Sequence, residues 1–206
     1  MILDLVFPAK CPLCGATGRA PCDLCWLALE PAPPGQVLAL LSYEGNGARL
    51  IRDLKYGDAR RAVERLADGM ALLVRPGSAD VVTWAPTLPQ RRRRRGYDQA
   101  ELLSRAVAKR LGLPCRRYLT RQPGLAQTGR LRVERLAHGP VFTPWPLARV
   151  GPARTVLVDD VVTTGATLLS AAQCLRSMGI AGVQPLAAAA TPVSSRTRAM
   201  ASVPSL

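Results

Sequence analysis

The sequence predicts an α/β domain, a parallel central sheet flanked by helices, with a small cysteine-bearing segment in front of it. Short apolar runs alternate with segments of helical periodicity, which is typical of a parallel sheet. One of these runs is followed by two carboxylates, then by small residues and a further helical segment. This order is typical of a strand that leads into the ligand site of an α/β domain. Four of the six cysteines lie in residues 1–35, which close with the linker sequence PAPPG. We therefore expect two units, residues 1–35 and residues 36–206.

The larger unit begins with an apolar run, Val37 to Tyr43, that predicts a strand, and Glu44 to Gly47 are typical of a turn. Apolar residues then recur at three- and four-residue steps up to position 73, which predicts helical structure. Residues 120–152 are rich in Gly, Pro and Arg and lack periodicity, and so long a stretch in a compact domain is often a lid. The other expected elements are strands over 80–84, 155–159 and 183–190 and helices over 98–110 and 166–178.

The charge of the chain favours a polyanionic ligand. Its 206 residues carry 28 lysines and arginines against 14 acids, a formal net charge of +14, and almost all of the basic residues are arginine. Arginine binds phosphate through two parallel hydrogen bonds, so nucleotides, diphosphates and nucleic acid are the expected classes of partner. The alternative, that arginine serves as a general surface cation, stays open for any single residue.

The first residues do not have the pattern of a targeting or membrane segment. MILDLVFP contains one acid and no base, and its apolar run stops at Pro8. This run is too short for a signal peptide or a membrane span, so we expect a cytoplasmic protein without membrane insertion.

The strongest functional pattern is TVLVDDVVTTGAT, from Thr155 to Thr167. Its apolar strand delivers Asp159 and Asp160 to the carboxyl edge of the predicted sheet, where they could accept hydrogen bonds from sugar hydroxyls or hold Mg²⁺. The small residues that follow allow backbone N–H groups to approach a phosphate, and the next helix adds its N-terminal amides. The pattern is neither a P-loop nor a dinucleotide-binding fingerprint. It predicts a cradle for a ribose and its phosphate; the alternative is a buried strand with an ordinary turn.

A metal site is predicted near the start of the chain. Cys11 and Cys14 form one C-x-x-C pair and Cys22 and Cys25 a second, and together they can offer four thiolates to one Zn²⁺. Four thiolates leave no open coordination position, so the expected zinc site is structural. A redox-active C-x-x-C is the alternative.

The sequence resembles one family over nearly its whole length. TVLVDDVVTTGAT is similar to the type I phosphoribosyltransferase signature at every position. The cysteine pairs, LKYGD at 54–58, RGYDQAELL at 95–103 and the segment 127–142 resemble the ComF/GntX-type branch, whose members are associated with DNA uptake and use. The resemblance implies a type I phosphoribosyltransferase fold with an N-terminal zinc-binding knuckle. It also implies 5-phosphoribosyl-1-diphosphate as the ligand, bound with Mg²⁺.

The resemblance implies roles for individual residues as well. Asp159 and Asp160 would bind the ribose hydroxyls and act as the catalytic carboxylates. The chain departs from the family pattern at the Trp84–Thr87 turn and at Asp98 and His138, which bears on the diphosphate and acceptor contacts. The other implied contacts are Val161, Thr163, Thr164, Gly165, Ala166 and Thr167 for the phosphoribosyl group, Ala85, Pro86, Thr87, Leu88, Arg91 and Arg95 for the diphosphate, and Arg121, Gln127, Arg130 and Arg135 in a mobile loop over the site.

Five arginines follow one another from Arg91 to Arg95. They repel one another unless an anion is present, so we expect some to face the diphosphate and others to follow a nucleic-acid backbone. A solvated helix start or loop is the alternative. Because only Tyr97 is an aromatic neighbour, backbone contact is favoured over base stacking.

Three interpretations of the function remain open at this point. The first is a phosphoribosyltransferase linked to competence, in which an unknown acceptor displaces diphosphate while Mg²⁺ and arginines neutralise the leaving group. The second is a non-catalytic competence module that binds single-stranded DNA and uses the fold as a ligand sensor. The third is a zinc-stabilised adaptor for a protein partner, such as another DNA-uptake protein.

Overall fold

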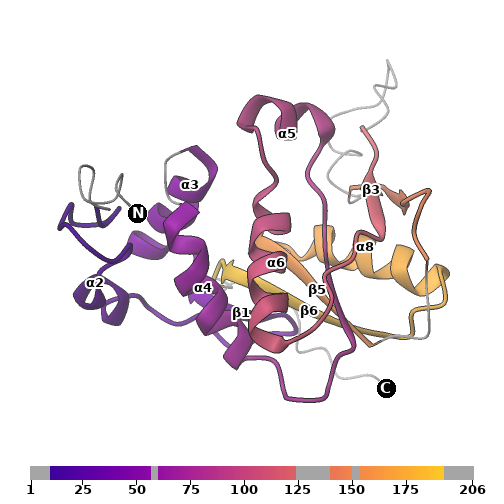
Figure 1. Ribbon diagram of the computed structural model, residues 1–206, viewed down its shortest axis with the longest axis horizontal. Helices are drawn as coiled ribbons and strands as arrows, with labels where there is room; N and C mark the ends of the chain where they lie inside the picture. Colours follow the sequence, from indigo (N-terminus) through magenta and orange to yellow (C-terminus); the bar gives the residue numbers. More distant parts are fainter. Residues whose placement is uncertain (1–9, 57–59, 124–139, 150–153, 193–206) are drawn as a thin grey trace, which may run out of the picture.

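A four-stranded parallel sheet forms the centre of the protein (Figure 1). The computed structural model describes residues 10–56, 60–123, 140–149 and 154–192. The order of the strands across the sheet is β1-β6-β5-β2, so the two longest strands lie in the middle. The strands are β1 (Leu38–Ser42), β2 (Val81–Trp84), β5 (Arg154–Val162) and β6 (Gly182–Ala190).

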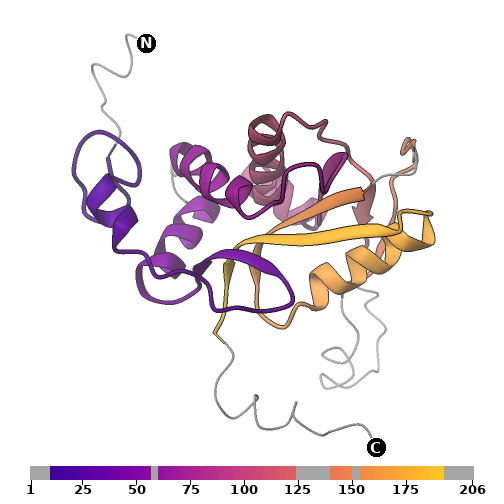
Figure 2. The same ribbon diagram turned by 90° about the horizontal axis from the view of Figure 1, so that it is seen from below.

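Helices cover both faces of this sheet. Helices α3 (Gly45–Tyr56), α4 (Arg60–Leu72) and α6 (Gln99–Leu111) lie on one face, and α8 (Ala166–Ser177) lies on the other (Figure 2). Successive residues of β5 alternate between the two resulting cores, as in a strand buried on both sides. None of the helices in the described ranges is long and apolar enough to span a membrane.

The predicted alternation of strands and helices is confirmed, and the larger differences lie at two element ends. Helix α3 begins at Gly45, inside the predicted turn. A Cβ at Gly47 would collide with the carbonyl oxygen of Ser42, so a glycine there lets α3 start directly against the end of β1. Strand β5 continues to Val162, past its predicted end at Asp159, because it stays paired with β6 over its whole length.

Two short strands fall in the stretch for which no element was expected. Strands β3 (Leu119–Arg121) and β4 (Phe142–Pro144) pair antiparallel and pack against α8. The stack of Arg117 on the ring of Trp145, 3.7 Å from guanidinium carbon to ring centroid, extends this small sheet. Its position brings Arg121 to the carboxyl edge of the large sheet.

The cysteine-bearing segment is held against helix α4. It contains the short helix α2 (Asp23–Leu27). Arg65 of α4 donates hydrogen bonds to the Pro21 carbonyl oxygen at 3.0 Å and to the Asp23 carboxylate at 2.6 Å. The Arg65 guanidinium also lies 4.8 Å from the ring centroid of Trp26. Division of the chain at residue 35 stays a prediction.

Candidate functional site

A polar cavity of about 280 Å³ opens at the carboxyl edge of the parallel sheet. Ligands of open α/β domains bind at this edge, because the loops that follow the strands meet there. The cavity is lined from the ends of β1, β2 and β5, from β3, from the start of α6 and from a short helix, α5 (Pro89–Arg95). The lining residues are Tyr43, Ala85, Thr87, Arg91, Arg95, Asp98, Gln99, Ala100, Arg121, Asp159, Asp160, Val161, Thr163 and Thr167.

Both predicted carboxylates of β5 line this cavity. Asp159 is buried and Asp160 is half-buried. Neighbouring side chains of a strand point to opposite faces of the sheet. The Asp159 carboxylate nevertheless accepts a hydrogen bond from the backbone N–H of Asp160, at 2.8 Å, which turns it toward the strand backbone. The two acids therefore border one space although they are consecutive in a strand.

The turn between β5 and α8 divides the predicted phosphate residues into two groups. Thr163 and Thr167 line the cavity. The other three shape the turn instead: the Thr164 hydroxyl oxygen accepts a hydrogen bond from the Ala166 N–H at 3.4 Å, and Gly165 takes a left-handed conformation with φ of 77°. Small residues here leave the N-terminal amides of α8 accessible to an anion.

The loop after β2 contributes Ala85 and Thr87 to the lining, whereas Pro86 and Leu88 of the same predicted loop do not line it. The loop is held by Asp98, whose carboxylate accepts a hydrogen bond from the Thr87 N–H at 2.8 Å.

Asp98 is also the N-cap of α6. Its second carboxylate oxygen accepts hydrogen bonds from the N–H groups of Ala100 and Glu101, at 3.1 and 3.4 Å. Burial raises the pKa of the Asp98 carboxyl, while the hydrogen bonds from Thr87, Glu101 and Ala100 act in the opposite direction. The Asp98 carboxylate thus accepts three hydrogen bonds from backbone donors and holds the loop after β2 to the start of α6.

The five arginines lie in helix α5. Because successive residues of a helix point in different directions, the five side chains do not all face the cavity. Arg91 and Arg95, one turn apart, line the cavity. Arg92 pairs with Glu101 of α6, with 3.3 Å between Nη2 and Oε2. The exposed residues 93–94 do not line this cavity, and they form no ion pair within the described ranges. Helix α5 therefore places two arginines in the cavity lining and two on the exposed surface.

Arg121 of β3 is the third arginine of the cavity. Burial and the neighbouring charge of Arg91 lower the pKa of its guanidinium, and Asp159, Asp98 and Asp160 act to raise it. An arginine stays charged in proteins, so Arg121 places a fixed positive charge within range of all three acids. The other predicted loop contacts, Gln127, Arg130 and Arg135, and also His138, lie outside the described residues.

Four lining residues were not among the predicted contacts. Asp98, Gln99 and Ala100 belong to the RGYDQAELL segment, in which Arg95 was the predicted contact and Asp98 was noted as a departure from the family pattern. Tyr43 follows directly after β1. Tyr43 could have been identified from the sequence, because ligands bind at the carboxyl ends of parallel strands and Tyr43 follows the first predicted strand.

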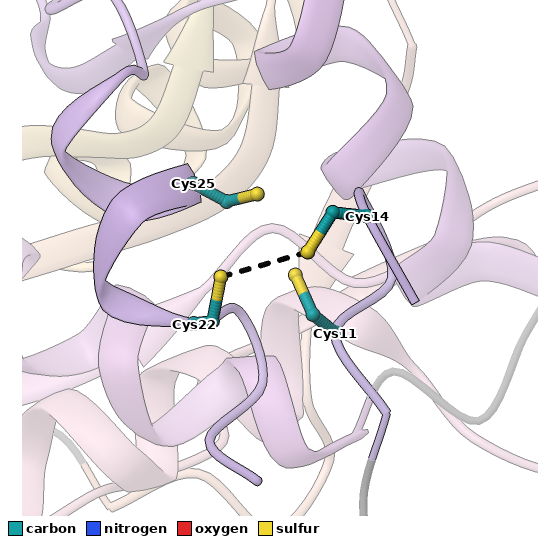
Figure 3. A group of neighbouring side chains, drawn as sticks. All are labelled: Cys11, Cys14, Cys22 and Cys25. Atoms are coloured by element: carbon teal, nitrogen blue, oxygen red, sulfur yellow. Dashed lines mark hydrogen bonds between the residues drawn. The ribbon is translucent and has the colours of Figure 1, made fainter. Parts of the chain in front are cut away.

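The four N-terminal cysteines converge on one point (Figure 3). Their sulfur atoms all lie within 4.8 Å of one another, and Cys14 Sγ is 3.7 Å from Cys22 Sγ. Four sulfurs at the Zn–S distance of about 2.3 Å from a tetrahedral ion are about 3.8 Å apart, so the cluster fits Zn²⁺. All six cysteines of the chain are described and are free thiols. The convergence of four sulfurs favours one metal over two separate redox pairs.

The thiols of this cluster differ in acidity. Burial raises the pKa of Cys11, but backbone hydrogen bonds from Cys22, Cys14 and Leu13 outweigh it and lower the pKa to about 6. Hydrogen bonding with Cys14, burial and the remaining cysteines raise the pKa of Cys25 to about 12. A bound cation would favour the thiolate form of all four cysteines, as expected of metal ligands.

The parallel sheet, the acid pair near the carboxyl end of β5 and the cysteine knuckle define the class of the protein: a type I phosphoribosyltransferase fold with an N-terminal segment that could bind zinc. The DNA utilization protein YhgH of Salmonella typhimurium is 31% identical over 187 residues, which cover 84% of this chain and 81% of that protein. Competence protein ComFC of Bacillus subtilis is 34% identical over 106 residues, covering 52% of this chain and 42% of that protein. The chain belongs to this ComF-type family of DNA utilization and competence proteins. No protein-family model matches it.

Solved structures with a related fold include two phosphoribosyl-dependent proteins. The glutamine phosphoribosylpyrophosphate amidotransferase of B. subtilis aligns with a TM-score of 0.45 and 20% identity, covering 66% of this chain and 30% of that longer chain. Purine phosphoribosyltransferase of Pyrococcus horikoshii aligns with a TM-score of 0.38 and 21% identity, covering 65% and 76%. These likenesses concern the fold alone.

Proposed function

We propose that the cavity binds 5-phosphoribosyl-1-diphosphate together with Mg²⁺, and that the protein is a phosphoribosyltransferase-like protein of DNA uptake and use. The observation that carries the proposal is the meeting, in one cavity, of the acid pair Asp159–Asp160 with the β5–α8 turn and three arginines. Paired carboxylates suit the vicinal hydroxyls of ribose, and arginines and helix amides suit the phosphates at its two ends. The names of the relatives support the role in DNA use.

Each part of the ligand has a counterpart in the lining. Asp159 and Asp160 bind the ribose hydroxyls, and the turn around Thr163 and Thr167 binds the 5′-phosphate. The loop at Thr87 binds the diphosphate, with Arg91 and Arg95 beside it. These assignments follow the order of the strand ends along the edge of the sheet.

The charge of the lining supports a metal requirement. Three arginines face three acids, Asp98, Asp159 and Asp160, so the lining by itself does not neutralise a diphosphate. Carboxylate oxygens fit Mg²⁺, and Asp159 and Asp160 are the residues that would hold it beside the substrate. When bound, the ion would supply positive charge to the leaving group.

In the transfer reaction, a nucleophilic atom of the acceptor forms a bond to C1 of the ribose. The C1–oxygen bond to diphosphate breaks, its electron pair leaves with the diphosphate, and the proton of the acceptor passes to solvent. The protein contributes by holding the ribose through its two carboxylates and by opposing the growing charge with Arg91, Arg95 and Arg121.

Calorimetric titration of the zinc-loaded protein with phosphoribosyl diphosphate and MgCl₂ tests the proposal. We expect saturable binding by the wild type and loss of binding by Asp159→Asn/Asp160→Asn. Asp80→Asn is the matched control, because Asp80 precedes β2 at the opposite end of the sheet and should leave binding unchanged. A folded wild type that binds no ligand would refute the proposal.

A second candidate function, binding of single-stranded DNA, is favoured by helix α5. This helix stands out from the body of the molecule (Figure 1), and Arg93 and Arg94 are exposed on it, away from the cavity lining. Contacts of this kind predict that log K falls against log salt with a slope of about −0.7 for each phosphate neutralised. An affinity for oligothymidylate that does not change with salt would count against the DNA function.

A further inference from the structure

We infer that Arg92 of α5 and Arg117, two residues before β3, form a second anion site that binds a phosphate group. The site goes beyond the proposed function, because neither residue lines the cavity at the edge of the sheet. The phosphate belongs either to a small phosphorylated molecule or to a nucleic-acid strand, and the experiment below distinguishes these two sources.

One carboxylate, that of Glu101, already serves two arginines next to this site. Its Oε1 accepts hydrogen bonds from Nε and Nη2 of Arg105, at 3.2 and 2.8 Å. Its Oε2 lies 3.3 Å from Nη2 of Arg92. Both oxygens of Glu101 are therefore engaged, and Glu101 and its two arginines together keep one positive charge.

Arg117 adds a further cation beside this group. The side chain is half-buried and forms no ion pair with any residue that the structure describes. Burial and the charge of Arg92 lower the pKa of the Arg117 guanidinium, whereas Glu101 and Asp98 act to raise it. An arginine stays charged in proteins, so the fold holds Arg92 and Arg117 within range of each other's repulsion. A bound anion would relieve this repulsion.

The Arg117 guanidinium is held in position but keeps hydrogen bonds to offer. It stacks on the ring of Trp145, with 3.7 Å between the guanidinium carbon and the ring centroid. Its Nε donates to the carbonyl oxygen of Leu119 at 3.4 Å. Both Nη groups lack a hydrogen-bond acceptor within the described ranges. Stacking fixes the plane of the group, so less conformational entropy is lost when these N–H groups bind an acceptor.

Phosphate fits the charge and the donors of this site. Glu101, Arg92, Arg105 and Arg117 together carry a net charge of +2, and a phosphate monoester carries about −1.5 to −2 at pH 7. Its oxygens can accept hydrogen bonds from two guanidinium groups at once. The Arg92 side chain is 47% exposed, so a ligand reaches the site from solvent.

NMR of the arginine Nε–H groups in the full-length, zinc-loaded protein tests the site. The Arg117 signal is identified by its absence in Arg117→Lys. We expect inorganic phosphate to move this signal saturably, and sodium chloride at equal ionic strength to leave it in place. The response should persist in Arg91→Ala/Arg95→Ala, which impairs the cavity and leaves the second site intact. An Arg117 signal that phosphate does not move, or moves only when Arg91 and Arg95 are present, would overturn the inference.

Charge reversal at Arg92 tests whether the two arginines share the ligand. Arg92→Glu places a carboxylate beside Arg117, so the phosphate affinity measured at the Arg117 signal should fall about tenfold or more. Arg75→Glu is the matched control: Arg75 is exposed in the loop between α4 and β2, and the affinity should stay within about threefold of the wild type. Circular dichroism monitors folding of both variants. Equal affinities in the two variants would overturn the assignment of Arg92.

Two further ligands identify the source of the phosphate. Diphosphate that moves the Arg117 signal at lower concentration than oligothymidylate, counted per phosphate, supports a site for a small phosphorylated molecule. The reverse order supports a site for a nucleic-acid strand, which would continue from the exposed Arg93 and Arg94. Because the readout is the Arg117 signal, loss of phosphoribosyl diphosphate binding in the cavity would refute the proposed function and leave this inference standing.

Discussion

The Asp98 carboxylate accepts a hydrogen bond from the backbone N–H of Thr87, with 2.8 Å between the oxygen and the nitrogen. The same side chain caps α6 through the N–H groups of Ala100 and Glu101. One buried carboxylate therefore holds the loop after β2 against the start of α6. These are the two elements that bring Thr87 and Gln99 into the cavity.

Replacing Asp98 should loosen both elements at once. Asp98→Ala removes the cap, which costs about 1 kcal/mol, and leaves the Thr87 N–H without its acceptor, which costs about 1–3 kcal/mol. We expect the free energy of unfolding to fall by about 2 kcal/mol or more in urea denaturation. Asp98→Asn should have a smaller effect, because its single oxygen can still cap the helix.

Glu30→Ala is the control for this experiment, since Glu30 is exposed, and its unfolding free energy should change by less than about 0.5 kcal/mol. An Asp98→Ala variant as stable as this control would show that Asp98 does not hold the two elements together.

The sequence predicts those parts of the fold and site that depend on neighbours in the chain. Strand and helix positions follow from local periodicity, and Asp159, Asp160 and Thr163 lie in one continuous motif. Tyr43 and Gln99 enter the cavity only because β1 and α6 are brought to the same sheet edge, and that depends on strand order. Strand order follows from pairing between distant segments, which local patterns do not encode.

The arginine run illustrates the same limit on a smaller scale. Its charge predicts an anionic ligand, but which of the five arginines face that ligand depends on how the helix is oriented. Once α5 forms, Arg91 and Arg95 share one face, and Arg92 turns to Glu101. Without the position of α6, no feature of five identical residues distinguishes these roles.

The cysteine cluster should bind one Zn²⁺ per chain. Cys14→Ser/Cys22→Ser removes two of the four thiolates and should reduce the zinc content, measured by mass spectrometry, to below about 0.2 ions per chain. Cys115→Ser is the control, because Cys115 lies far from the cluster in the sequence, beside Ser104, and it should keep its zinc. Full zinc content in the double variant would exclude this site.

The same double variant tests whether the zinc site affects ligand binding in the cavity. No residue of the described segment 10–35 lines the cavity, so phosphoribosyl diphosphate should bind with a dissociation constant within about twofold of the wild type. Loss of ligand binding in a variant whose sheet remains folded would show that the knuckle supports the cavity.

The pair Asp80–Arg154 should make stability depend on acid pH. Arg154 donates to the Asp80 carboxylate from its side chain, at 2.6 and 3.1 Å, and from its backbone N–H, at 2.8 Å. These bonds lower the pKa of Asp80 to about 2. In the unfolded chain the pKa is about 3.9, so the unfolded state binds more protons between these values. The stability from the pair is therefore full above pH of about 4 and is lost as the pH falls toward 2.

Denaturation of the wild type and Asp80→Asn between pH 2 and 6 measures this contribution. The difference in unfolding free energy should be largest at the upper end and should shrink as the pH approaches about 2. Taking the difference cancels the effects of acid on the cysteine cluster. A difference that stays constant over this range would mean that the pair does not form in solution.

The two groups of arginines on α5 should act on different ligands. Arg91→Ala/Arg95→Ala removes two cations from the cavity lining and should weaken the binding of phosphoribosyl diphosphate with Mg²⁺ by about tenfold or more. Arg93→Ala/Arg94→Ala should leave that binding unchanged, because neither residue lines the cavity. The second pair should instead lower the affinity for fluorescent oligothymidylate and reduce the slope of log K against log salt by about 1.4, the value for two phosphate contacts. Equal effects of both variants on both ligands would show that α5 acts as one undivided basic surface.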